Sequence, residues 1–150
     1  MPIARGAGTE IIRCASFQDT DGDQDLIIGV QYHIYTVLNI TIQCQALNAT
    51  TDNFRIFLKG WDAHNGTSAV EHYIVNENMQ VGDTYVFSEK FSMNGYEPDS
   101  SAMSGIMNTA AEQDAIADQG GSTAQYLRFG CDAATDNYDV HVTFIDQNNA

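Results

Sequence analysis

Residues 34–47 read I-Y-T-V-L-N-I-T-I-Q-C-Q-A-L, in which every even-numbered position except Thr36 is apolar. Polar side chains fall on the positions between them, namely Asn39, Thr41, Gln43 and Gln45. Successive side chains of a β-strand point to opposite faces, so this period of two predicts a long strand with one buried face.

The same alternation returns in seven shorter runs, at residues 10–17, 26–32, 53–60, 69–75, 84–93, 124–131 and 138–146. Turn-forming residues separate the runs. Asn65-Gly66 favours a positive φ, and Val81-Gly82-Asp83 is typical of the turn that closes a hairpin. Short turns between consecutive strands predict antiparallel pairing. Eight strands at this spacing predict an all-β fold, an antiparallel β sandwich or jelly roll.

Two segments depart from the strand pattern. Residues 94–123 form an excursion that is too long for a plain connection, and a short helix is predicted within it at residues 110–117. Thr109 and Glu112 have the spacing of a capping box, and Gly120-Gly121 ends the helix. Residues 1–9 are mostly small and carry two glycines, so we expect an extended N-terminal arm before a single β-sandwich domain at residues 10–150.

The charge and the apolar content of the chain indicate which classes of partner to expect. Six basic residues against 20 acidic ones give a net charge of -14, which repels the phosphate backbone of nucleic acids and anionic lipid headgroups. No apolar stretch is long enough for a membrane helix, and the first residues lack the apolar core of a signal peptide. We therefore expect neither a nucleic-acid nor a membrane partner. Cys14, Cys44 and Cys131 are widely spaced, as buried small hydrophobic residues of a reducing compartment would be.

Residues 19–25 read D-T-D-G-D-Q-D and are the sharpest candidate for chemistry. The four carboxylates are Asp19, Asp21, Asp23 and Asp25. Carboxylates this close repel one another unless a hard cation such as Ca²⁺ neutralises them. The EF-hand pattern places a glycine sixth and a glutamate twelfth, where this chain has Gln24 and Val30. Two interpretations stay open, a solvated acidic turn and a Ca²⁺ site.

A second candidate is the loop that contains Trp61, Asp62, His64 and Asn65. These side chains could hold a glycan by stacking and hydrogen bonding, although a turn anchored by a buried tryptophan is the commoner arrangement. The four histidines are scattered, and His72 shares a strand face with Val70 and Ile74, so we expect it to be half-buried rather than a metal ligand. Neither G-x-S-x-G nor a glycine-rich phosphate loop is present, and no enzymatic activity is expected.

Several aromatic residues lie on or beside the face opposite the apolar stripe of their runs, namely Tyr32, Tyr35, Phe57, Tyr73 and Tyr96. Aromatic side chains on a second face suggest that a partner subunit covers it. The alternative is that they line turns and strand ends.

The arm M-P-I-A-R-G-A-G-T, the alternating strands and the ending D-A-A-T-D-N-Y-D-V-H-V-T-F-I-D-Q-N-N-A resemble the small virion proteins of tailed bacteriophages, particularly head decoration or cement proteins. The resemblance implies a homo-oligomer, commonly a trimer, that is made in the host cytoplasm, binds the major capsid protein on the capsid surface and reinforces the lattice. The arm could add a strand to a neighbouring sheet edge. Its expected partner-binding residues are Pro2, Ile3, Ala4, Arg5, Gly6 and Gly8. A glycan-binding module of a host-recognition fibre and a tail or baseplate component are the alternatives.

Overall fold

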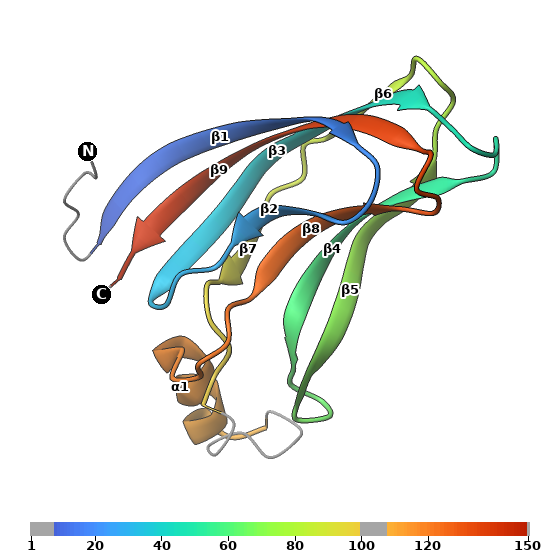
Figure 1. Cartoon of the computed structure of the whole chain (residues 1–150). Coiled ribbons are helices and arrows are strands. Elements are labelled where there is room, and N and C mark those ends of the chain that lie inside the picture. The colour runs from blue at the N-terminus through green and yellow to red at the C-terminus, as the bar shows by residue number, and fades with distance from the viewer. Residues whose placement is uncertain (1–7, 100–107, 150) are drawn as a thin grey trace.

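The computed structural model describes residues 8–99 and 108–149, and it folds them into nine strands and one helix (Figure 1). The strands are β1 (Thr9–Thr20), β2 (Gln24–Ile28), β3 (His33–Ala46), β4 (Asn53–Asp62), β5 (Thr67–Asn78), β6 (Thr84–Phe87), β7 (Phe91–Asn94), β8 (Tyr126–Cys131) and β9 (Asn137–Asn148). The helix is α1 (Ala110–Asp118). Within the described ranges, no helix is long and apolar enough to cross a lipid bilayer.

The strands form two antiparallel sheets, one in the order β1-β9-β3-β6 with β7 also paired to β3, and the other in the order β2-β8-β4-β5. Connections cross from one sheet to the other except at β4–β5 and β6–β7. This is the two-sheet jelly roll, and the predicted fold class is confirmed. The hairpin predicted at Val81-Gly82-Asp83 is wrong, because this turn carries the chain from β5 in one sheet to β6 in the other.

A bulge in β3 changes which side chains face the core. The pairing of β3 with β9 shifts between Val37 and Asn39. Before the shift, the odd-numbered Tyr35 and Val37 are buried, and after it the even-numbered Ile40 and Ile42 are buried. One extra residue reverses the faces of a strand. The prediction that one set of even positions is buried along the whole run therefore fails before the bulge, and Tyr35 lies in the core rather than on a second face.

The predicted strand at residues 84–93 is two strands. β6 pairs with residues 40–43 of β3, and β7 pairs with residues 34–37. The break at residues 88–90 therefore lies opposite the bulge in β3, where a regular ladder cannot continue.

The core fills the space between the two sheets. Its fully buried aromatic residues are Phe54, Phe129 and Tyr138, which contact one another with ring centroids 5.2–6.4 Å apart. Cys44 is buried as expected, but Cys14 is exposed on β1, so the expectation of three buried cysteines is wrong there. All three are free thiols.

The connections gather at two ends of the sandwich (Figure 1). One end carries four of them, residues 21–23, 47–52, 79–83 and 132–136, which hold six aspartates and no lysine or arginine. We call this the acidic end. The opposite end carries the β2–β3 connection, the β4–β5 turn and α1.

Candidate functional site

The predicted Ca²⁺ segment lies at the acidic end. Asp19 has a φ of 54°, and its backbone N–H donates to Asp139 Oδ1 over 3.1 Å. Asp25 forms an ion pair with Arg128, and a Cβ atom added at Gly130 would lie 2.9 Å from Asp23 Oδ1. Among the described residues, no group of three or more His, Cys, Asp and Glu side chains lies close enough to hold a metal ion. The Ca²⁺ site stays a prediction.

A buried aspartate and a partly exposed one join two loops of the same end. Asp136 is fully buried and accepts hydrogen bonds from the backbone N–H groups of Asn48, at 2.7 Å, and Ala133, at 3.1 Å. Desolvation, followed by its hydrogen bond with Asp136, raises the pKa of Asp52 above its ordinary value. The hydrogen bonds of these two carboxyl groups tie residues 47–52 to residues 132–136.

The predicted ligand loop is organised by its own aspartate. Asp62 Oδ1 accepts from the backbone N–H groups of His64, at 3.0 Å, and Asn65, at 3.2 Å, while Asp62 Oδ2 accepts from Asn65 Nδ2 at 2.6 Å. These hydrogen bonds, led by that from the Asn65 side chain, lower the pKa of Asp62. The loop is therefore a turn whose polar groups form hydrogen bonds with one another. Trp61 is partly buried, and its Nε1 has no hydrogen-bond partner among the described atoms.

Sequence reasoning missed a cavity of about 250 Å³ beside Trp61. It is lined by Leu58, Trp61, His72, Met93 and Gln125, among others, and lies between the edges of the two sheets. His72 is exposed rather than half-buried as expected, because β5 is an edge strand.

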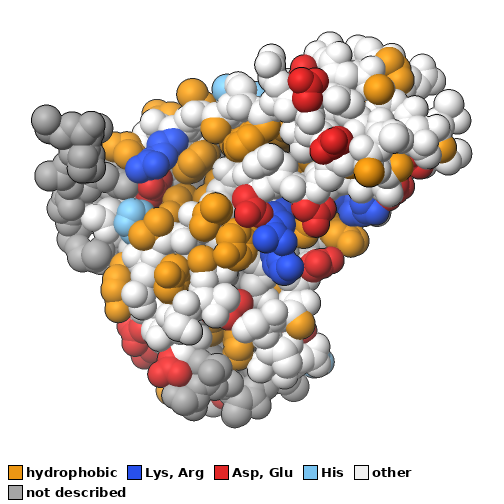
Figure 2. Space-filling model, in the orientation of Figure 1, with side chains coloured by type: hydrophobic (Ala, Val, Ile, Leu, Met, Phe, Trp, Pro, Cys, Tyr) orange, Lys and Arg blue, Asp and Glu red, His pale blue; other side chains and the backbone are white. Residues whose placement is uncertain are grey.

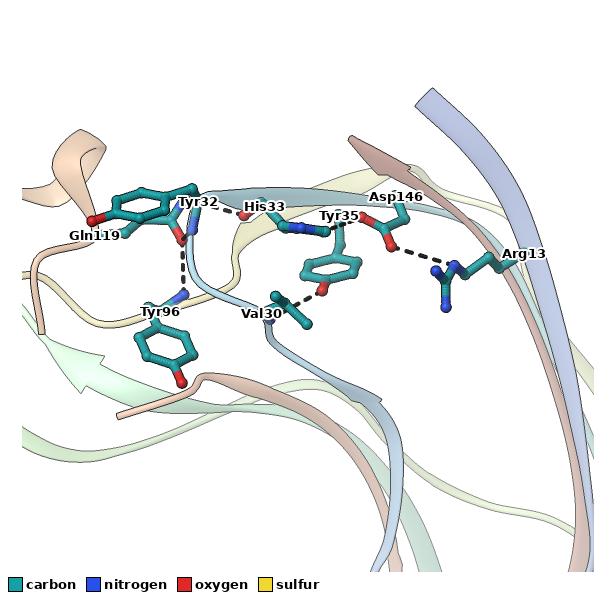
Figure 3. Close-up of polar contacts among 8 residues, drawn as sticks. All are labelled: Arg13, Val30, Tyr32, His33, Tyr35, Tyr96, Gln119 and Asp146. Atoms are coloured by element: carbon teal, nitrogen blue, oxygen red, sulfur yellow. Dashed lines mark hydrogen bonds and ion pairs between the residues drawn. The ribbon is translucent and has the colours of Figure 1, made fainter. Parts of the chain in front are cut away.

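The opposite end contains a polar network that no sequence motif indicated (Figure 3). Asp146 is buried, and its carboxylate contacts His33 Nδ1 at 2.7 Å and Arg13 Nε at 3.3 Å. The ring of His33 stacks on that of Tyr35 with centroids 6.1 Å apart, and the Tyr35 hydroxyl accepts from the backbone N–H of Val30 at 3.0 Å. This network fixes the start of β3 against β1 and β9.

Gln119 attaches α1 to this end. It caps the helix with a φ of 49° and is buried. Its Oε1 accepts from the backbone N–H groups of Tyr32 and Tyr96, each at 3.0 Å, and its Nε2 donates to the carbonyl of His33 at 3.1 Å (Figure 3). Nothing in the sequence distinguishes this glutamine from the others, since its partners are backbone groups far away along the chain.

The predicted arm joins the domain beside this network. Residues 1–7, with the expected partner-binding residues Pro2, Ile3, Ala4, Arg5 and Gly6, lie outside the described residues. The backbone N–H of Gly8 donates to the Asn148 carbonyl, and that of Asn149 donates to the Tyr32 carbonyl at 2.9 Å.

Three large hydrophobic residues are exposed near this junction. Ile12 is 71% exposed, Val30 50% and Tyr32 43%. The β2–β3 connection, residues 29–32, has no charged side chain. Figure 2 shows hydrophobic side chains gathered on the left half of the molecule, over β1 and β2. We call Ile12, Val30 and Tyr32 the junction patch.

No protein-family model matches the sequence, and no curated protein matches it. Among solved structures, a chain of the acidic stable capsid structure of Helicobacter pylori bacteriophage KHP30 matches with 8% identity and a TM-score of 0.45, covering 97% of this chain and 92% of that one.

A chain of the Bacillus endospore appendages, described as disulfide-linked pili, matches with 7% identity and a TM-score of 0.41, covering 100% of this chain and 97% of that one. A chain of infectious bursal disease virus, Gx strain, matches with 9% identity and a TM-score of 0.32, covering 95% of this chain and 37% of that one. Likenesses this low carry no argument about function.

Proposed function

We propose that this protein is a structural protein of a phage virion, a decoration or cement protein that binds the major capsid protein on the head surface and stabilises the lattice as a homo-oligomer. The observation that carries the proposal is the junction patch, Ile12, Val30 and Tyr32, beside the point where the arm enters the domain. Large exposed side chains near a small-residue arm are typical of a surface that a partner protein covers.

Strand β1 also supports the proposal, through its outer edge. It has 12 residues, contains no proline, and forms the edge of its sheet, so its outer side has no strand neighbour among the described residues. An uncovered edge is a template for an added strand, and main-chain hydrogen bonds then supply affinity with little demand on side chains. A capsid subunit can pair with β1 while the arm and the junction patch contact its surface.

The charge distribution fits a protein displayed at high density. The acidic end lies at the opposite end of the sandwich from the junction patch (Figure 1). When the junction patch faces the capsid, the acidic end faces solvent, and its aspartates other than the buried Asp136 keep neighbouring particles apart by repulsion.

A glycan-binding module of a host-recognition fibre is the second candidate. One observation favours it, the partnerless Nε1 of Trp61 beside a cavity of about 250 Å³. A buried indole N–H ordinarily finds an acceptor, which a ligand hydroxyl would supply. A tail or baseplate component, rather than a head component, is a variant of the first candidate.

Co-sedimentation with purified phage heads tests the proposal. We expect the full-length protein to pellet with heads, and we expect both deletion of residues 1–9 and the Val30→Asp substitution to weaken pelleting. Val81→Asp is the matched control, because Val81 is 59% exposed but lies at the acidic end. Pelleting that is unchanged by both alterations, or binding of a glycan panel without binding to heads, would overturn the proposal.

A further inference from the structure

The strand registers define the outer face of the β2-β8-β4-β5 sheet. Residues opposite one another on antiparallel strands point to the same side. One row across the four strands is Ile28, Tyr126, Lys59 and Glu71, and the next is Asp25, Arg128, Phe57 and Tyr73. Arg55 and Asn76 follow in a third row. The alternate residues Leu127 and Phe129 of β8 are fully buried, so these rows face away from the core, although Phe57 is itself only 5% exposed.

The other sheet has a different outer face. Its rows are Ile12, Ile145, Thr36 and Ser92, then Cys14, Thr143 and Asn39, then Ser16, His141, Thr41 and Val86. These rows contain no arginine, lysine, phenylalanine, tyrosine or tryptophan. Most of their side chains are threonine, serine and asparagine, which a solvated sheet face ordinarily carries, although Ile12 of the junction patch, Ile145 and Val86 also lie there. The aromatic and arginine side chains therefore belong specifically to the β2-β8-β4-β5 face.

These aromatic and basic side chains are held in place. Arg128 lies over the Tyr126 ring, 4.9 Å from its centroid, and pairs with Asp25. Arg55 lies 5.9 Å from the centroid of the Tyr73 ring and pairs with Asp132. Tyr73 in turn packs edge-on against Phe57, with centroids 5.6 Å apart. Side chains that are already ordered lose little conformational entropy when a partner covers them.

The composition of this face is that of a protein interface. Tyrosine, phenylalanine and arginine are enriched at the centres of interfaces and contribute most of their binding energy. Ile28 is 58% exposed and Tyr73 is 48% exposed, so the face has apolar area left to bury.

Charge indicates which partner fits. Arg55, Lys59 and Arg128 are half of the six basic residues of the chain, and Asp25, Glu71 and Asp132 balance them, the last from a loop of the acidic end. Asp23, whose carboxylate lies against Gly130, adds one further negative charge at the border with that end. The face is therefore close to neutral in a chain of net charge -14. A second copy carries the same negative charge, and it meets the least repulsion where both surfaces are neutral. Alternating charges also let the basic side chains of one copy approach the acidic side chains of the other.

We propose that the outer face of β2, β8, β4 and β5 is the surface through which copies of this chain associate. This inference deepens the homo-oligomer of the proposed function, but it depends on no capsid contact. It leaves β1 and the junction patch available for a different partner.

Sedimentation velocity on the purified full-length protein, without capsids, tests the inference. We expect the wild-type protein to self-associate. Ile28→Asp adds a charge at the edge of the face and should weaken association by about tenfold or more. Lys59→Glu leaves the face net negative and should do the same. The matched control is Val86→Asp, because Val86 is 56% exposed on the outer face of the other sheet.

Circular dichroism and melting curves establish that each variant is folded. A wild-type protein that stays monomeric up to about 100 μM would overturn the inference, since an interface weaker than this has little affinity. Association of Ile28→Asp at wild-type strength, or equal loss in Val86→Asp, would also overturn it. Because capsids are absent from the experiment, failure here is distinguishable from failure to bind heads.

Discussion

Replacement of Gln119 by alanine tests whether one side chain attaches the helical excursion to the sandwich. The change removes the acceptor of two backbone N–H groups, those of Tyr32 and Tyr96, and the donor to the His33 carbonyl. A partly buried backbone group that loses its partner destabilises the fold by about 1–3 kcal/mol. Water reaches some of the vacated space, so we expect a total loss of about 2–4 kcal/mol in the free energy of unfolding.

Backbone strain contributes a separate effect that can be isolated. Gln119 has a positive φ, which alanine tolerates poorly and glycine adopts readily. Gln119→Gly therefore removes the same hydrogen bonds without this strain, and we expect it to lose slightly less stability than Gln119→Ala. Gln113→Ala is the matched control, since Gln113 is an exposed glutamine of the same helix.

Urea unfolding followed by the fluorescence of Trp61, the only tryptophan, measures these free energies. Hydrogen exchange at the amides of Tyr32 and Tyr96 measures the two bonds directly, and both should exchange faster in the alanine variant. If Gln119→Ala unfolds at the same urea concentration as Gln113→Ala, then the helix is held by other contacts and the reasoning fails.

Three further predictions concern the acidic end and the packing at the opposite end. The pKa of Asp52 is raised in the folded protein, so its contribution to stability is present below about pH 4 and is lost as the pH rises through the raised value. The melting temperature of Asp52→Asn should therefore rise relative to that of the wild type as the pH increases. A difference in melting temperature that stays constant with pH would contradict this. If Ca²⁺ binds at residues 19–25, chelation lowers the melting temperature and the double variant Asp21→Ala, Asp23→Ala no longer responds, whereas identical melts with and without chelator remove the hypothesis. Gly95→Ala should destabilise by about 3 kcal/mol, because its Cβ would lie 1.9 Å from the Val30 carbonyl oxygen, while Gly22→Ala, which meets nothing within 4 Å, should be near neutral in the same denaturation assay.

The sequence predicted the strands well because one physical signal, alternation with a period of two, marks each of them. It predicted α1 because Thr109 caps the helix and accepts from the backbone N–H of Glu112 at 3.3 Å. Alternation does not say which strands are neighbours, so the crossing of the chain between sheets was not predictable. The bulge in β3 was not predictable either, since the apolar residues fit an unbroken strand, and for that reason Tyr35 was assigned to the wrong face.

The candidate sites also divide into those that a local sequence pattern indicates and those that only the fold brings together. Carboxylates clustered along the chain, such as those of residues 19–25, attract attention in a sequence, but the structure uses Asp25 in an ion pair with Arg128, which lies 103 residues away. The aromatic and arginine rows arise from four strands brought together by the fold, and no segment of the sequence contains more than a part of a row. Side chains that lie together only through strand register leave no local pattern.

The distribution of charge reconciles strong acidity with assembly. Six aspartates lie in the loops of the acidic end, and one of them, Asp132, pairs with Arg55 at the border of the outer face of β2, β8, β4 and β5. The β2–β3 connection has no charge, and this outer face is close to neutral. Charges in water are largely screened beyond about 8 Å at physiological ionic strength. Copies that meet through the neutral face therefore experience little repulsion from acidic ends that project away from the contact. It follows that added salt should change self-association only modestly, while it should reduce the mutual repulsion of the acidic ends, so solubility and self-association respond to different parts of the same surface.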